Sequence, residues 1–478
     1  MKKWMIRALS ALLIAAFLPL SVLADEYDLS QGSVTVSTTK GADGSTQQNV
    51  THKENTKPDS NPVITSNGNE TKNTITIQAG AGTTANVTIK DANISASSGK
   101  AAIKTGGEGN VNLNVEGTNT VSSGSNYAGV EKANAGNLTI GSESGSGELT
   151  ANGGWHGAGI GGGHYRDAND ITITGGEVTA NGGDGAAGIG GGYYSYGKDI
   201  TISGGKVVAN GSGSAAGIGG GHYGNGSNIT ISGGEVTATG GDYGAGIGGG
   251  YYGNGSNITI SGGEVTATGG DCGAGIGGGY GRGGSSIAIS KDSQVEAVGG
   301  AVGGAGGSSD GCGAAIGNGG NNNRVNGSEI EPDTSGLYTT GKVERIRGDG
   351  TVLDTITGTV EPPVEPEKSA SSEEEPDKRE PLYRVLNLDG SSLKHQAQKA
   401  DGVLALTANA DGAILTGTLR ALGYLQNQGI EKITFTDGTH SAELVLAELI
   451  AKGQPEEVYV LTLGAENTLT LNGETIDF

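Results

Sequence analysis

The phrase Gly-Ile-Gly-Gly-Gly begins at Gly159 and starts again at Gly188, Gly217, Gly246 and Gly275, each time 29 residues further along the chain. Self-similarity at a fixed period is the signature of a repeat architecture, in which each unit buries its apolar side only by stacking on the next unit. We therefore expect an elongated solenoid rather than a compact globule.

The pattern within one unit predicts three short strands. Gly244–Gly250 holds a single Ile, Ile258–Ile260 reads Ile-Thr-Ile, and Glu264–Ala267 repeats that alternation. Alternation with period 2 puts one set of side chains in a core and the other in solvent. Glycine pairs at 262–263 and 269–270 supply corners, because glycine reaches positive φ at little steric cost. Three strands in about 29 residues predict one coil of a right-handed parallel β-helix, with coils roughly 4.8 Å apart.

The composition restricts the class of protein and of partner. Of 478 residues 94 are glycine and only 4% are aromatic, which is too little bulk for an ordinary globular core. The net charge of −22 disfavours nucleic acid as a partner, because phosphate binding needs clustered Lys and Arg. The acidic surface suits a soluble protein outside the cell.

Shifts in composition predict five segments. Residues 1–24 read as a secretory signal peptide, with Lys2, Lys3 and Arg7 before an apolar run and a cleavage site ahead of Asp25. No later stretch is apolar enough to span a membrane, so we expect a secreted protein, either released or attached non-covalently to a surface. The remaining segments are an N-terminal cap at 25–72, the β-helix at 73–360, a Pro- and Glu-rich linker at 361–381 and a small α+β domain at 382–478.

The α+β assignment of the last segment depends on its hydrophobic pattern. Thr418–Gln428 reads as a helix that ends at Gly429. The predicted strands are Leu382–Leu388, Val403–Thr407, Ile433–Phe435, Glu443–Leu446 and Val458–Leu463.

Stacked coils turn the repeat into columns of side chains, and the most distinctive column is aromatic. Its rings would repeat at about the strand spacing, close to the repeat of an extended glycan, and aromatic faces bind the C–H surfaces of sugars without charge. The column predicts a carbohydrate-binding platform; the alternative is that the rings pack only on one another. Its members are His164, Tyr165, Tyr193, Tyr194, His222, Tyr223, Tyr251, Tyr252 and Tyr280.

Two further columns suggest a metal and a crosslink. Asp184, Asp242 and Asp271 share one register position, with Gly213 between them, which makes calcium a candidate cofactor if backbone carbonyls complete the shell. Cys272 and Cys312 precede matching phrases in adjacent coils, so their Cα atoms should lie within reach of a disulfide. The alternative is two buried free thiols.

Motifs for catalysis are absent from the sequence. His156, His164 and His222 have no Ser or Cys nucleophile in a recognisable arrangement, and the scattered carboxylates form no distinguished acid/base pair. We therefore expect a protein that is not an enzyme.

Residues from about 74 to 320 resemble a known family. The phrase Ala158–Gly163 followed by Ile171–Val178, and its copies, are similar to the Gly-Ala-Gly-Ile-Gly-Gly-Gly repeat proteins secreted by Firmicutes. That family is described as carbohydrate-binding and is similar to a pectate-binding right-handed β-helix family. The resemblance implies a non-catalytic binder of plant or microbial cell-wall polysaccharide, with calcium as a candidate aid to binding, and it assigns no site residue here.

Two functions from different classes remain open at this stage. The first is polysaccharide binding along the coil surface. The second is an extracellular adhesin or structural spacer, in which the coils serve as a rod and the C-terminal domain meets a protein or cell-wall partner.

Overall fold

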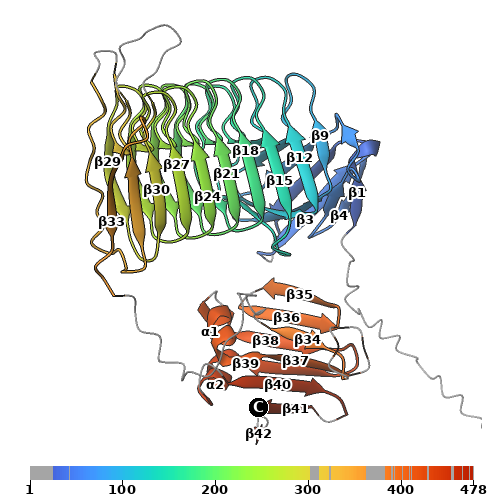
Figure 1. The fold of residues 1–478 in the computed structure, drawn as a ribbon. Coiled ribbons are helices and arrows are strands. Elements are labelled where there is room, and N and C mark those ends of the chain that lie inside the picture. The colour runs from blue at the N-terminus through green and yellow to red at the C-terminus, as the bar shows by residue number, and fades with distance from the viewer. Residues whose placement is uncertain are drawn as a thin grey trace, which may run out of the picture. The chain divides into compact units, whose positions relative to one another are not determined.

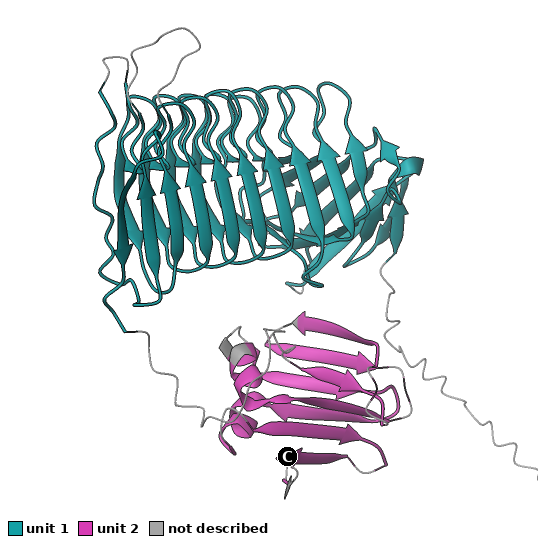
Figure 2. Cartoon of the chain, viewed as in Figure 1, with its two compact units in different colours: residues 1–366 teal, residues 367–478 magenta. Residues whose placement is uncertain are grey.

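The computed structural model describes residues 25–41, 44–301, 312–321, 325–361, 383–388, 391, 393–400, 402–408, 410, 412–427, 430–453, 457–465, 467–472 and 474–476. The chain divides into two compact units, Met1–Pro366 and Glu367–Phe478 (Figure 2). The signal peptide expected at 1–24, and all but the first residue of the linker expected at 361–381, lie outside the described residues and stay predictions.

The first unit is a parallel β-helix, as the repeat predicts, and its coils stack along one axis (Figure 1). Each regular coil contributes one strand to each of three long sheets, which we call sheets A, B and C. Sheet A contains β1 (Glu26–Asp28), β5 (Val63–Thr65), β8 (Thr84–Lys90), β11 (Asn110–Glu116), β14 (Leu138–Gly141), β17 (Ile171–Ile173), β20 (Gly197–Ile202), β23 (Gly226–Ile231), β26 (Gly255–Ile260) and β29 (Gly284–Ile289).

Sheet B carries the glycine-rich phrases, and sheet C carries the Glu-Val-Thr-Ala strands. Sheet B contains β4 (Asn55–Pro58), β3 (Thr46–His52), β2 (Val34–Lys40), β7 (Ile75–Ala79), β10 (Ile103–Gly107), β13 (Val130–Glu131), β16 (Ile160–Gly161), β19 (Ile189–Gly190), β22 (Ile218–Gly219), β25 (Ile247–Gly248), β28 (Ile276–Gly277) and β31 (Ile316–Gly317). Sheet C contains β6 (Glu70–Thr71), β9 (Asn93–Ser95), β12 (Thr118–Ser122), β15 (Glu148–Asn152), β18 (Glu177–Asn181), β21 (Lys206–Asn210), β24 (Glu235–Thr239), β27 (Glu264–Thr268), β30 (Gln294–Val298), β32 (Lys342–Ile346) and β33 (Val352–Thr357).

The 29-residue register is confirmed residue by residue. Ile200 pairs with Ile229, which pairs with Ile258 in the next coil, and each of these side chains is fully buried. Removing an isoleucine side chain from water contributes about 1.5–3 kcal/mol, so the repeated columns supply most of the core stabilisation. The alternate apolar side chains of the two predicted strands, and the single Ile side chain of the glycine phrase, all lie in this core.

Both ends of the β-helix are closed by chain segments that leave the repeat. At the N-terminal end, η1 (Leu29–Gln31) follows β1, and β2, β3 and β4 form antiparallel pairs at the edge of sheet B. Residues 25–72, which we expected to form a cap, therefore also supply strands to all three sheets. At the other end β33 turns back antiparallel on β32.

The second unit is the predicted α+β domain. One sheet has the order β34 (Arg384–Leu386), β37 (Ala413–Thr418), β40 (Val458–Leu463), β41 (Thr468–Leu471) and β42 (Glu474–Thr475). The other has the order β35 (His395–Ala400), β36 (Val403–Ala408), β38 (Lys432–Thr436) and β39 (Ser441–Val445). The helices are α1 (Leu419–Asn427), where a helix was predicted, and α2 (Leu446–Ile450), which was not. Gly429 lies outside the described residues, and no helix of the described chain is long and apolar enough to cross a membrane.

The predicted disulfide between Cys272 and Cys312 is wrong, because the structure shows both as buried thiols with no disulfide between them. Their coils do pair as expected, since Ile276 lies opposite Ile316. Register fixes the spacing of two backbones but not the directions of their Cα–Cβ bonds, which a disulfide also needs. Cys272 has a left-handed backbone with φ of 60°, and its amide bonds to the carbonyl of Ala301 at 2.9 Å, ahead of the insertion that interrupts the repeat.

Candidate ligand-binding surface

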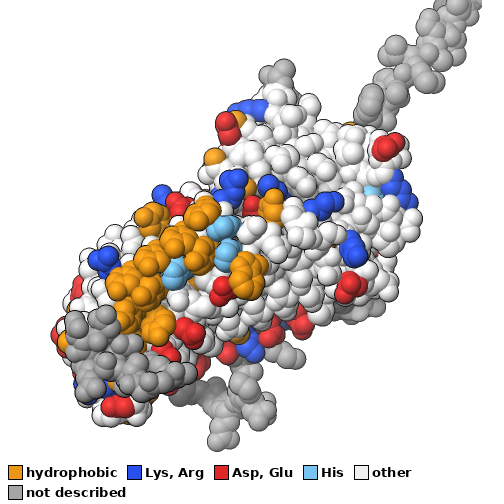
Figure 3. Space-filling view, turned by 90° about the horizontal axis from the view of Figure 1, so that it is seen from above, with side chains coloured by type: hydrophobic (Ala, Val, Ile, Leu, Met, Phe, Trp, Pro, Cys, Tyr) orange, Lys and Arg blue, Asp and Glu red, His pale blue; other side chains and the backbone are white. Residues whose placement is uncertain are grey.

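Two rows of aromatic rings follow the corner between sheet B and sheet A, coil after coil. Of the nine large hydrophobic side chains that are well exposed among the described residues, four lie at this corner, namely Tyr165, Tyr194, Tyr196 and Tyr223, and Trp155 lies beside them on the turn between β15 and β16. Figure 3 shows the band of hydrophobic and histidine side chains that results. Large apolar side chains gathered at one place on a surface mark an interaction site.

The inner row, which we define as His156, Tyr193, His222, Tyr251 and Tyr280, is a continuous stack. Its centroids are 4.2, 5.1, 5.2 and 5.3 Å apart in chain order, and neighbouring planes differ by 3–22°. Tyr280 closes the row and is buried, with only 5% of its surface exposed. The other four rings are half-buried, and the continuous stack makes the inner row mainly a packing element.

The outer row, which we define as Tyr165, Tyr194, Tyr223 and Tyr252, lies towards solvent. Its centroids are 5.7, 5.2 and 5.8 Å apart, with interplanar angles of 30°, 8° and 10°. Tyr165, Tyr194 and Tyr223 are 68%, 46% and 44% exposed. The predicted alignment of these rings at the coil spacing is confirmed.

The two rows form a herringbone. Within one coil the inner and outer rings are nearly perpendicular, at 80° for Tyr193 and Tyr194 and at 89° for His222 and Tyr223. The two rows share one axis but their ring planes are nearly perpendicular to each other, so at most one row can have its planes at right angles to that axis. The rings are therefore tilted and offset, an arrangement that aromatic pairs prefer.

The outer tyrosines occupy backbone positions that normally suit glycine. Their φ values are 58°, 61°, 60° and 54°, all left-handed, where a bulky residue is strained by about 1–3 kcal/mol. In the next coil the same position is Gly281, with φ of 67°. Four successive coils thus keep a strained tyrosine where glycine would fit without strain.

The first inner position differs from the prediction. We expected His164 beneath Tyr193, but His156 stacks there instead, 4.2 Å away and within 14° of parallel. His164 is tilted by 60° to Tyr193 and stacks on Tyr165 at 4.0 Å. The cause lies in the backbone, because the amide of Tyr193 bonds to the carbonyl of His156. The signal missed in the sequence is a second aromatic position eight residues earlier, occupied again by Tyr243, which makes edge contacts with Tyr251 and Tyr280.

The outer row ends at a cation. The Arg282 guanidinium lies 5.7 Å from the centroid of the Tyr252 ring, and its Nε donates to the carbonyl of Tyr252 at 3.1 Å. This cation–π contact covers the last ring where the following coil has no tyrosine.

The inner hydroxyls remain protonated at neutral pH. Burial, and then the hydroxyl of Tyr252, raise the pKa of Tyr251 to about 12. Burial likewise raises the pKa of Tyr193, with a further contribution from the Tyr194 hydroxyl. Tyr193 and Tyr251 are therefore neutral phenols.

The acidic column does not assemble into a metal centre. Asp242 and Asp271 are in adjacent coils, while the coil of Gly213 separates both from Asp184. Within the described ranges no group of three or more His, Cys, Asp or Glu side chains could hold a metal ion. The calcium prediction gains no support from this arrangement.

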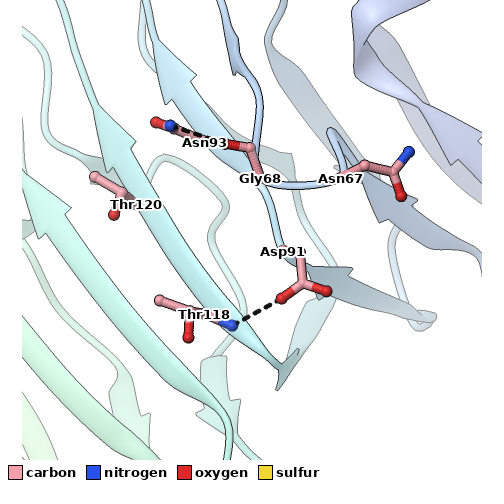
Figure 4. A pocket seen from close by; sticks show the side chains of 6 residues that line it. All are labelled: Asn67, Gly68, Asp91, Asn93, Thr118 and Thr120. Carbon is pink, nitrogen blue, oxygen red and sulfur yellow. Dashed lines mark hydrogen bonds between the residues drawn. The ribbon is translucent and has the colours of Figure 1, made fainter.

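A hollow of about 400 Å³ lies among the early coils, lined by Asn67, Gly68, Asp91, Asn93, Thr118 and Thr120. Figure 4 shows two hydrogen bonds across it: the Thr118 amide donates to Asp91 at 3.0 Å, and Asn93 donates to the Gly68 carbonyl at 3.2 Å. These hydrogen bonds join neighbouring coils, so we assign the polar groups around the hollow a structural role in the turns.

The half-buried histidines of the inner row predict acid sensitivity. Burial lowers the pKa of His222 and of His156, although the Asp184 carboxylate opposes both shifts. A histidine with a lowered pKa contributes its full stability above the unfolded value of about 6.5, and loses it as the pH falls through the folded value. We expect the unfolding midpoint to fall as the pH drops below about 6.5. His222→Tyr, which places in this coil the residue found in the coils on either side, should flatten that slope. An identical pH profile for the variant and the wild type would contradict this.

Comparison with known proteins agrees with the fold. The family model described as Beta helix repeat matches residues 144–164, 171–193, 200–222, 229–251 and 258–280. The match supports a right-handed β-helix repeat over the regular coils of the first unit. No curated protein matches the chain. No solved structure matches it either.

Proposed function

We propose that this is a secreted, non-catalytic protein that binds polysaccharide along the β-helix, with the outer tyrosine row as its platform. The observation that carries the proposal is the repeated left-handed tyrosine, exposed to solvent in coil after coil. Ring stacking alone accounts for the inner row. It does not account for keeping strained, half-exposed rings above that row.

The spacing and chemistry of the row fit an extended sugar chain. Rings repeat every 5.2–5.8 Å, close to the length of one sugar unit, and their exposed ring atoms and hydroxyls suit the C–H and O–H groups of sugars. Pairs of aromatic rings contribute about 0.5–1.5 kcal/mol each, and we take the same order of magnitude for a ring against a sugar. The resemblance to secreted carbohydrate-binding repeat proteins points to a plant or microbial cell-wall glycan.

The test is affinity electrophoresis of the full chain in gels containing hydroxyethyl cellulose, xylan or polygalacturonate. The double variant Tyr194→Gly/Tyr223→Gly should lose about tenfold in apparent affinity, because two rings are removed. Glycine is chosen because it suits the left-handed backbone, as Gly281 shows. The substitution should therefore remove the rings without unfolding the coil.

Thr230→Ala is the matched control, because Thr230 lies on the outer side of sheet A, away from the aromatic corner. It should be retained like the wild type. Equal retention of the wild type and the tyrosine variant in every gel that retards the protein would reject the platform, and wild-type mobility unchanged by every glycan would reject the function.

The alternative is a surface adhesin or spacer that presents the second unit to a protein or cell-wall partner. It is favoured by the separate compactness of Glu367–Phe478. Cell binding by full-length protein that persists in the tyrosine variant would favour this alternative.

A further inference from the structure

A polar hollow lies beside the end of the outer row at Tyr252. It has a volume of about 290 Å³, and Asn254, Gly281, Arg282 and Asn318 are among its lining residues. Arg282 belongs both to this hollow and to the contact with the Tyr252 ring. A methyl group added at Gly281 would come within 3.3 Å of that same ring. The hollow is thus continuous with the tyrosine row.

The side-chain amides of the hollow are held in one orientation. The Gly283 amide donates to Oδ1 of Asn254 at 3.2 Å, and the Gly284 amide donates to Oδ1 of Asn318 at 3.1 Å. Fixing each oxygen also fixes the Nδ2 group on the same carbon. Neither Nδ2 has a hydrogen-bond partner among the described residues, so each remains a donor that is already oriented.

The hollow is also unlike the rest of the surface in charge. The chain carries a net charge of −22, yet the described lining residues include Arg282 and no Asp or Glu. A guanidinium with five donors uses its Nε on the Tyr252 carbonyl. Donors therefore dominate, and they suit a ligand rich in acceptor oxygens.

We propose that this hollow is a terminal subsite that receives the oxygen atoms of one sugar unit at the end of a chain lying on the tyrosine row. The inference rests on the proposed polysaccharide binding and adds direction to it. The donors lie at one end of the row, whereas the other end is the exposed ring of Tyr165. A bound chain is thereby fixed in register instead of sliding along four equivalent rings.

The sharpest test replaces the two amide donors by acceptor oxygens while keeping the shape of both side chains. In Asn254→Asp/Asn318→Asp each new carboxylate can still accept from Gly283 or Gly284, but the two Nδ2 donors are replaced by oxygens. We expect about a tenfold loss of apparent affinity in the gels that retain the wild type, since hydrogen bonds to the ligand become repulsive contacts. Unfolding midpoints should stay close to the wild-type value.

Asn225→Asp is the matched control. Asn225 occupies the same column one coil earlier, where its Oδ1 accepts from the Asn254 amide at 2.8 Å, and it is not among the residues that line the hollow. It adds one carboxylate to the same column, against two in the double variant, and should be retained like the wild type.

The outcomes separate the two levels of the proposal. A larger loss with polygalacturonate than with hydroxyethyl cellulose identifies carboxylate oxygens as the group received, and equal losses identify hydroxyls; both support the subsite. Wild-type retention of the double Asp variant, together with loss in the tyrosine variant, overturns the subsite alone. Absence of retention for the wild type in every gel overturns both.

Discussion

Gly248→Ala is expected to lower the free energy of unfolding of the β-helix by about 3–5 kcal/mol, the sum of backbone strain and overpacking. Gly248 has φ of 136°, a conformation that residues with a Cβ rarely adopt. An added Cβ would lie 2.0 Å from the carbonyl oxygen of Gly277 in the next coil. That oxygen already accepts from the Gly249 amide at 3.0 Å, so it cannot move aside without breaking the ladder between coils.

Gly175→Ala is the control for this substitution, because nothing but Ser142 comes within 4 Å of a Cβ there, at 3.9 Å, and its φ is not left-handed. Its unfolding midpoint in guanidinium should lie within about 0.5 kcal/mol of the wild type. Similar midpoints for the two variants would show that close coil contact at Gly248 does not limit stability.

Asp354→Ala is expected to cost about 2–3 kcal/mol by uncovering a buried cation at the C-terminal end of the β-helix, somewhat less than for a fully buried pair because Asp354 is 40% exposed. Arg345 pairs with Ala297 in sheet C, so it continues a column of buried alanines into the last coil, and only 5% of it is exposed. Its guanidinium binds both carboxylate oxygens of Asp354, with Nε donating at 2.7 Å, and also contacts Glu331. Removing Asp354 leaves the guanidinium with the more exposed Glu331 and the carbonyl of Ile330.

The exposed pair Lys206 and Glu177, 3.6 Å apart in the same sheet, is the control. Glu177→Ala should change the free energy of unfolding by less than about 0.5 kcal/mol, because surface ion pairs contribute little. The pH provides a second check. The hydrogen bond from Arg345 lowers the pKa of Asp354, so its contribution is present above the unfolded value of about 3.9 and disappears as the pH falls further. The wild type and Asp354→Ala should converge in acid; a constant difference would count against the ion pair.

Sequence reasoning worked best where a residue acts through its position in the repeat. The Ile columns, the three strands of each coil and the alignment of Tyr194 with Tyr223 all follow from one period, because parallel strands in register place equal positions above one another. The second unit has no repeat, and there β35, β37, β41, β42 and α2 were not predicted. Their pairings join segments whose sequences carry no common pattern.

The sequence was least informative where two segments of the chain pack against each other. His156 takes the place expected for His164 because the corner brings together residues eight positions apart within a coil. Cys272 meets Ala301 because the chain leaves the repeat between the two cysteines. The hollow beside Tyr252 joins Asn254 to Asn318, and these two residues lie on opposite sides of that insertion.

The sequence by itself determined the coil, its period and the layering of the tyrosines, since each depends only on spacing along the chain. Only the tertiary structure decided which rings are exposed to solvent, which are buried, and that the outer row ends beside the hydrogen-bond donors of the hollow. Those properties depend on the direction of each Cα–Cβ bond and on the segments packed beside it, and left-handed corners such as that of Tyr223 change that direction in ways that spacing does not encode.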